Sequence, residues 1–292
     1  MQISDFRESA AHIGSAPDLE EFYDNEAAEF HLPGANVHRV LHDCMHSQLL
    51  GTGKVANGSA LVFLCESSLW NPFQPAGLYE DALAHSLQLA HKDFIAWKKA
   101  MKLSVSQPRF TPARLSRKHR MMFACLSSKA APGKAVTMWL ATRCVEWAQR
   151  GDGVTHTEKL VATCMHSYAV ALRIMDESDL LLTPEQAQEF YRQIMLHLRS
   201  FAVLNKESRG LRGKVVGKNL WLLIVKHHHL HHAGRLVLQE RVNPRSWNLF
   251  AGEDFVGRIS RISRACHRTT VALRTLQRYL ALLHLELDNL KL

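Results

Sequence analysis

The chain has 292 residues, 47% of them hydrophobic, and a formal net charge of +9 at pH 7. This length allows one large domain or two small ones with a sizeable core. No apolar run approaches the roughly 18 residues of a membrane-spanning helix, the N-terminus lacks the basic-then-apolar order of a secretory signal, and the six cysteines form no C-x-x-C pair. We therefore expect a nuclear or cytoplasmic protein with reduced thiols, neither secreted nor membrane-bound.

The positive charge is concentrated in two blocks. Residues 98–143 contain 11 Lys and Arg and no acidic residue, and residues 205–278 contain 15 Lys and Arg against 4 Asp and Glu. The first 97 residues contain 13 acidic residues against 4 basic ones. The basic blocks could face a polyanion such as DNA, or they could pair with the acidic segments inside the fold.

The first candidate site lies in the segment HDCMHSQLLG at residues 42–51. Asp43 and His46 are three residues apart, which places both on one face of a helix. Asp43 could bind a metal ion, and His46 could orient that metal or a phosphate. The alternative is an aspartate that stabilises a helix start through the helix dipole, beside an ordinary histidine.

Helical periodicity dominates residues 71–204. Apolar residues recur at alternating steps of four and three from Leu83 to Met101, which predicts one amphipathic helix. Further helices are predicted over 134–149 and 158–175.

The segment TPEQ predicts a helix start at Pro184, because the threonine before it can cap and the glutamine after it can reach back to the cap. Two short apolar runs, residues 59–64 and 220–225, could be strands or buried helix segments, since such runs do not reveal their period.

A proline-bounded loop at residues 108–120 lies inside the acid-free block and mixes basic groups with one aromatic. Such a loop could follow a nucleic-acid backbone, with Phe110 available for stacking on a base. The candidate phosphate-binding residues are Arg109, Arg114, Arg117, Lys118 and Arg120.

The C-terminal basic block opens with the histidine cluster KHHHLHH at residues 226–232. His228 and His232 are four residues apart and could bind zinc from one helix face, although zinc normally needs three or four protein ligands. The alternatives are helix capping, contact with phosphate together with Lys226, and a solvated surface patch.

A second arginine-rich segment follows. Arg258, Arg261, Arg264 and Arg268 share one helical stripe that suits phosphates, and Glu253 lies with a second acid at the start of that helix. Glu253 could be a metal-binding carboxylate beside phosphate-binding arginines, or it could simply favour the helix start.

A leucine seam from Leu276 to Leu290 resembles a short coiled coil and indicates either a homo-oligomer contact or packing within the chain.

Two of these segments resemble cut-and-paste transposases of the CACTA and Kyakuja–Dileera–Zisupton type, as found in transposon-derived proteins of dinoflagellates. Asp43-x-x-His46 with the following Leu and Gly is similar to their D-x-x-H-x-x-x-L-G segment, and Lys226-x-His228-x-x-x-His232 to the K-x-H-x-x-x-H segment before their last catalytic acid. Glu253 would match that acid.

The resemblance covers residues 36–70 and 205–285. It implies an RNase H-like core interrupted by a helical insertion, with Mg²⁺ held by Asp43 and Glu253 and with His46 and His228 positioning a phosphate or carboxylate. The first of the three acids of such enzymes has no convincing counterpart before Asp43, so the resemblance implies a chain lacking the front half of the family.

We therefore expect a mainly α fold, in which a remnant of the RNase H-like core would surround a large helical insertion. Its regions are an N-terminal segment (1–70), a helical insertion (71–204) and a basic C-terminal region (205–292). The expected function is that of a transposable-element-derived DNA-binding protein, with a truncated Mg²⁺-dependent strand-cleaving enzyme as its active form. The alternatives are a non-catalytic nucleic-acid-binding module and a helical interaction or scaffold protein that could form a homo-oligomer through the leucine-rich helix.

Overall fold

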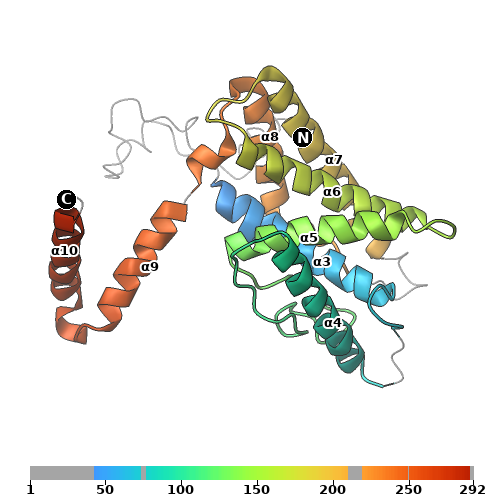
Figure 1. The fold of residues 1–292 in the computed structure, drawn as a ribbon, viewed down its shortest axis with the longest axis horizontal. Coiled ribbons are helices and arrows are strands. Elements are labelled where there is room, and N and C mark those ends of the chain that lie inside the picture. The colour runs from blue at the N-terminus through green and yellow to red at the C-terminus, as the bar shows by residue number, and fades with distance from the viewer. Residues whose placement is uncertain (1–42, 74–76, 210–218, 249, 290–292) are drawn as a thin grey trace, which may run out of the picture. The chain divides into compact units, whose positions relative to one another are not determined.

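A computed structural model describes residues 43–73, 77–209, 219–248 and 250–289, with the backbone alone described at 250–254 and 289. These residues are mainly helical, as predicted (Figure 1). The α-helices are α3 (Gly53–Glu66), α4 (Tyr79–Ala100), α5 (Ala130–Ala148), α6 (His156–Glu177), α7 (Pro184–Ser208), α8 (Val225–Glu240), α9 (Phe250–Arg264) and α10 (Val271–Asn289). A π-helix, η3 (Met45–Thr52), precedes α3, and short 3₁₀ helices occur at η4 (Pro244–Trp247) and η5 (Arg268–Thr270).

Helix α3 is the most buried helix of the body formed by α3 to α8. Residues Val55 to Cys65 are all buried, because α4, α5 and α6 pack against it. Helices α5, α6, α7 and α8 pack against one another in chain order, and α8 returns to contact η3. The start and the end of this body are therefore neighbours in space.

The predicted periodicities correspond to buried helix faces. Leu83, Leu87 and Phe94 on α4 are fully buried, whereas Met101 lies just past the end of that helix and is exposed. Helix α7 begins at Pro184 with the predicted capping box, in which Thr183 and Gln186 satisfy each other's backbone amides.

No β-strand occurs within the described residues, where the only bridge is an isolated pair, Leu181 with Val242. Residues 59–64 belong to α3, so the helical alternative for that run is correct. Residues 220–224 form an irregular segment with a bend at Trp221, neither strand nor helix, and Val225 begins α8. One hydrophobic cluster joins Leu61, Trp139 and Trp221, so residues from all three predicted regions share a single core.

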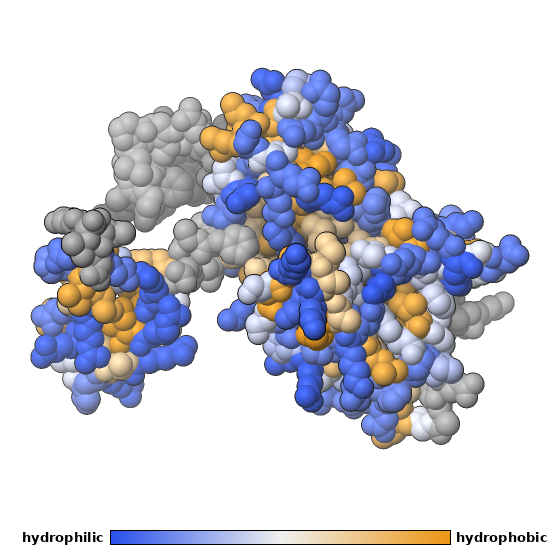
Figure 2. Space-filling view, in the orientation of Figure 1, coloured by the Kyte–Doolittle hydropathy of each residue, from blue (hydrophilic) through white to orange (hydrophobic). Residues whose placement is uncertain are grey.

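Helices α9 and α10 form an antiparallel hairpin. Phe255 meets Tyr279 edge-on at 5.4 Å between ring centroids, and the Arg278 guanidinium donates to the carbonyl of Ala265 at 3.0 Å, at the end of α9. Figure 2 shows apolar side chains gathered over this hairpin with hydrophilic ones around them. No described helix has both the length and the hydropathy needed to cross a membrane.

Candidate functional site

Asp43 caps the first turn of the helix that it precedes. Its two carboxylate oxygens accept hydrogen bonds from the backbone amides of Met45 (3.1 Å) and His46 (2.8 Å). The His46 Nδ1 atom also lies 2.5 Å from Asp43 Oδ2. These contacts match the capping alternative for the D-x-x-H pattern, because they satisfy helix amides that have no intrahelical partner.

The two segments of the transposase-like pattern lie side by side. A Cβ atom on Gly51 would fall 2.4 Å from Cδ of Lys226 and 2.8 Å from the carbonyl oxygen of His46. The absence of a side chain at position 51 therefore allows α8 to approach η3 this closely. Asp43 and His46 come from the first segment and Lys226 from the second, about 180 residues later.

The histidines of α8 have different roles. His227 is buried, and its Nδ1 accepts a hydrogen bond from the amide of Ile224 at 3.1 Å, which caps the helix. Burial lowers the pKa of His227 to about 4. The Nε2 atoms of His228 and His232 lie 2.7 Å apart, so one ring donates to the other. Burial is also the main cause of a lowered pKa at His231.

The described residues do not assemble a metal site. No group of three or more His, Cys, Asp or Glu side chains that could hold a metal ion occurs among them. The Asp43 oxygens accept helix amides, and the side chain of Glu253 lies outside the described residues, so the predicted Asp43–Glu253 pair has no described geometry.

Buried side chains alternate with exposed charges along the proline-bounded loop at residues 108–120. Phe110 is 3% exposed, Leu115 and Arg117 are fully buried, and Pro112 is also buried. The exposed basic side chains are Arg109, Arg114, Lys118 and Arg120. The buried side chains hold the loop on the protein, and the four cations remain exposed, although the Arg120 Nη2 also lies 4.0 Å from Glu66 Oε2. We call this segment with its four exposed cations the basic loop.

Phe110 does not offer a stacking surface, so that prediction was wrong. Its ring lies parallel to Trp139 of α5 at 5.7 Å and also contacts Phe94 and His91. This aromatic cluster buries apolar surface, which outweighs exposure of the ring on a loop.

Arg117 was predicted to bind nucleic acid, and this was wrong because its side chain is fully buried. Its Nη2 lies 3.3 Å from the Glu66 carboxylate, and its Nε donates to the Tyr79 hydroxyl at 2.8 Å. Its Nη1 donates to the carbonyls of Met122 and Asn219. A buried guanidinium with these partners is a structural anchor. Glu66 was missed as its partner because no motif marks a lone acid at a helix end.

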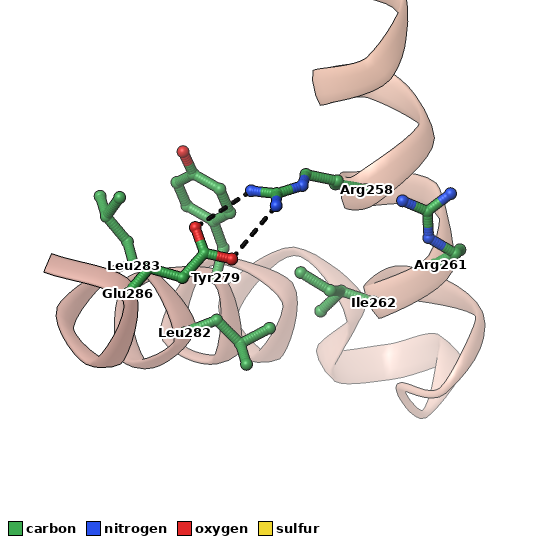
Figure 3. A pocket seen from close by; sticks show the side chains of 7 residues that line it. All are labelled: Arg258, Arg261, Ile262, Tyr279, Leu282, Leu283 and Glu286. Atoms are coloured by element: carbon green, nitrogen blue, oxygen red, sulfur yellow. Dashed lines mark hydrogen bonds and ion pairs between the residues drawn. The ribbon is translucent and has the colours of Figure 1, made fainter. Parts of the chain in front are cut away.

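The arginines of α9 also divide into two roles. Arg258 forms a two-pronged ion pair with Glu286 of α10, at 3.1 and 3.2 Å, across a cavity of about 340 Å³ (Figure 3). Arg261 lines the same cavity, and both Arg261 and Arg264 are exposed. Arg268 is exposed too, but it lies in η5 beyond the end of α9 and so does not continue the predicted stripe on that helix. Arg274, which was not selected from the sequence as a binding residue, is exposed as well.

The leucine seam lies largely on the surface of the hairpin. Leu276, Leu280 and Leu287 are 55%, 52% and 49% exposed, and Leu283 is partly buried beside the cavity. Leu290 lies outside the described residues. Packing of this seam within the chain is therefore not observed for the three exposed leucines.

Comparison with known proteins gives no match: no family model, no curated protein and no solved structure is similar to this chain.

Proposed function

We propose that this protein binds nucleic acid through contacts between its basic loop and the phosphate backbone. The supporting observation is the alternation of buried anchors and exposed cations between Phe110 and Arg120. A cation on an anchored loop loses little conformational freedom on binding, and guanidinium groups suit phosphate oxygens. No acidic residue occurs between positions 98 and 143, and Glu66 of α3, which lies against Arg117 and Arg120, is itself only 5% exposed.

The α9–α10 hairpin offers a second set of cations for the same role. Arg261, Arg264, Arg268 and Arg274 are exposed, whereas Arg258 is held by Glu286. Phosphate contacts of this kind carry affinity rather than sequence information, so we expect binding with little base specificity. DNA is the expected partner and the nucleus the matching location.

Binding of duplex DNA by the full chain tests this function. Arg109, Arg114, Lys118 and Arg120 are changed together to Gln and compared with a control in which exposed Lys159, Arg173, Arg192 and Arg199 are changed to Gln. Both variants lose the same charge, so the comparison isolates the position of the cations. Affinity of the loop variant should fall by at least about tenfold, and that of the control by much less. Equal losses would contradict the proposal.

Descent from a transposase is part of this proposal, and the contact between Gly51 and Lys226 supports it, because it unites the two segments that carry the resemblance. On this reading the helices between them derive from the insertion. The resemblance also makes a metal-dependent nuclease the second candidate function.

The double variant Asp43→Ala, Glu253→Ala separates the two candidates. If the protein is a nuclease, this variant loses the Mg²⁺-dependent nicking of DNA that the wild type shows. If it is a binding module, neither the wild type nor the variant nicks DNA, and the variant keeps the wild-type affinity for DNA. Nicking that is unchanged in the variant would reject Asp43 and Glu253 as the metal site.

A further inference from the structure

A cavity of about 420 Å³ lies between η3, α5, α6 and η4, apart from the basic loop. Its apolar wall is formed by Met45, Leu49, Leu172 and Met175, with Cys44 beside them. Its polar wall is formed by Gln48, Lys134, Asp176, Arg245 and Asn248. This volume and this mixture of an apolar wall with a few polar groups are typical of sites for small organic molecules.

Gln48 is the unusual member of the lining. Its side chain is 1% exposed, and Nε2 donates to Cys44 Sγ at 3.1 Å, but Oε1 has no hydrogen-bond partner among the described residues. A buried amide oxygen without a donor costs about 1–3 kcal/mol. Such a group points to a ligand that supplies a hydroxyl or N–H donor.

The backbone around Gln48 is also unusual. Met45, Gln48 and Leu49 all belong to the π-helix η3, and the amide of Gly53 bonds to the carbonyl of Gln48, five residues earlier. A π-helix of this length is rare, and shorter ones are frequent at functional sites. The Thr52 hydroxyl supports the turn by donating toward the carbonyls of Ser47 and Gln48 at 3.4 and 3.2 Å.

The charges in the polar wall favour an anion. Lys134 contacts both carboxylate oxygens of Asp176, at 2.8 and 2.9 Å, so these two charges offset each other. Arg245 is exposed, and Nη1 donates to the backbone carbonyl of Asp176 at 3.2 Å. No other hydrogen bond from its guanidinium occurs among the described residues, so most of the fork is available to a carboxylate.

We propose that this cavity binds a small organic acid with an apolar or aromatic body, a carboxylate held by Arg245, and a hydroxyl or N–H group that donates to Gln48. The ligand would bury its body against Met45, Leu49, Leu172 and Met175, whose two methionines can adapt to its shape. This site is independent of the proposed nucleic-acid binding.

Three matched probes test each part of the proposal in the full chain: 3-(4-hydroxyphenyl)propionate, 3-phenylpropionate, which lacks the hydroxyl, and tyramine, which carries a cation in place of the acid. Calorimetry should show saturable binding of the hydroxylated acid, with the other two weaker by about fivefold or more. Absence of saturable binding up to about 5 mM, or equal binding of tyramine, would overturn the proposal.

Substitutions test separately the proposed ligand contact with Gln48 and the one with Arg245. Gln48→Leu should remove the preference for the hydroxylated acid over 3-phenylpropionate, and Arg245→Gln should weaken both acids by about tenfold. Leu49→Trp fills the cavity and should abolish binding, while the control Arg173→Gln, on an exposed position of α6, should leave it unchanged. Circular dichroism and thermal unfolding check that each variant is folded. Affinities unchanged in both Gln48→Leu and Arg245→Gln would reject the site.

Discussion

Gly51 of η3 and Lys226 of α8 are in direct contact, although 174 residues separate them in the sequence. The contact depends on the missing side chain at position 51, where even a methyl group would meet Lys226 Cδ at 2.4 Å. It holds the start of the described chain against α8, and it brings Asp43 and His46 into the same neighbourhood as the helix that carries His228 and His232.

This contact predicts an energetic coupling between the two positions. Gly51→Ala should lower the free energy of unfolding by about 1–3 kcal/mol, because the added methyl group overlaps Lys226 and the His46 carbonyl. In a Lys226→Ala background the cost should be smaller by about 0.5–1 kcal/mol, since part of the overlap is gone. Denaturant unfolding of the four proteins measures this coupling. Gly77→Ala is the control, because nothing lies within 4 Å of a Cβ there. Strictly additive costs would show that the two residues do not touch.

Arg117 and Arg114 should differ sharply although both belong to the same loop. Arg117→Met leaves the carboxylate of Glu66, 5% exposed, without its buried guanidinium and should cost about 3–5 kcal/mol of stability. Arg114→Met removes an exposed cation and should change stability by less than about 0.5 kcal/mol while weakening DNA binding. Urea unfolding and DNA titration of both variants check this. An Arg117→Met protein as stable as the wild type would contradict the buried network.

His197 predicts a loss of stability in acid. Burial lowers its pKa to about 3, and Nδ1 lies 2.9 Å from the Cys164 carbonyl oxygen, so the native ring stays neutral where the unfolded ring, with its ordinary pKa of 6.5, takes up a proton. The unfolded state therefore binds more protons between these values, and stability falls as pH drops from 6.5 toward 3, by up to about 1.4 kcal/mol per pH unit.

Unfolding free energies measured between pH 4 and 6 test this titration. His197→Phe should flatten the dependence by up to about 1.4 kcal/mol per pH unit, and His166→Phe, at an exposed position of α6, should leave the dependence as it is. The same slope in the wild type and in His197→Phe would show that His197 is not the group responsible.

The exposed leucines of α10 predict self-association through the hairpin. Leu276, Leu280 and Leu287 lie on one stripe of the helix and are about half exposed. Changing the three to Ser should convert an oligomer to a monomer in light scattering, because a second copy would bury this stripe. Leu180→Ser and Leu181→Ser, on an exposed loop, form the control. A wild-type chain that is monomeric at about 100 μM would contradict this contact.

The helices could be predicted because their signals are local. The apolar period of α4 and the capping box of α7 lie within each element, and both occur where they were expected. The burial of Phe110 and Arg117 depends on Trp139 and Glu66, which are distant in the sequence, so no local pattern separates these residues from the exposed Arg109 and Arg114. For Asp43 the sequence left capping and metal binding open, and the observed hydrogen bonds are those of a cap.

The salt dependence of DNA binding tests the central claim most directly. The affinity of the wild type and of the loop variant at Arg109, Arg114, Lys118 and Arg120 is measured between about 50 and 200 mM salt. If the four cations contact phosphates, removing them should make the slope of log affinity against log salt concentration less negative by about 3–4. A loop variant that keeps both the wild-type slope and the wild-type affinity would contradict nucleic-acid binding by the basic loop.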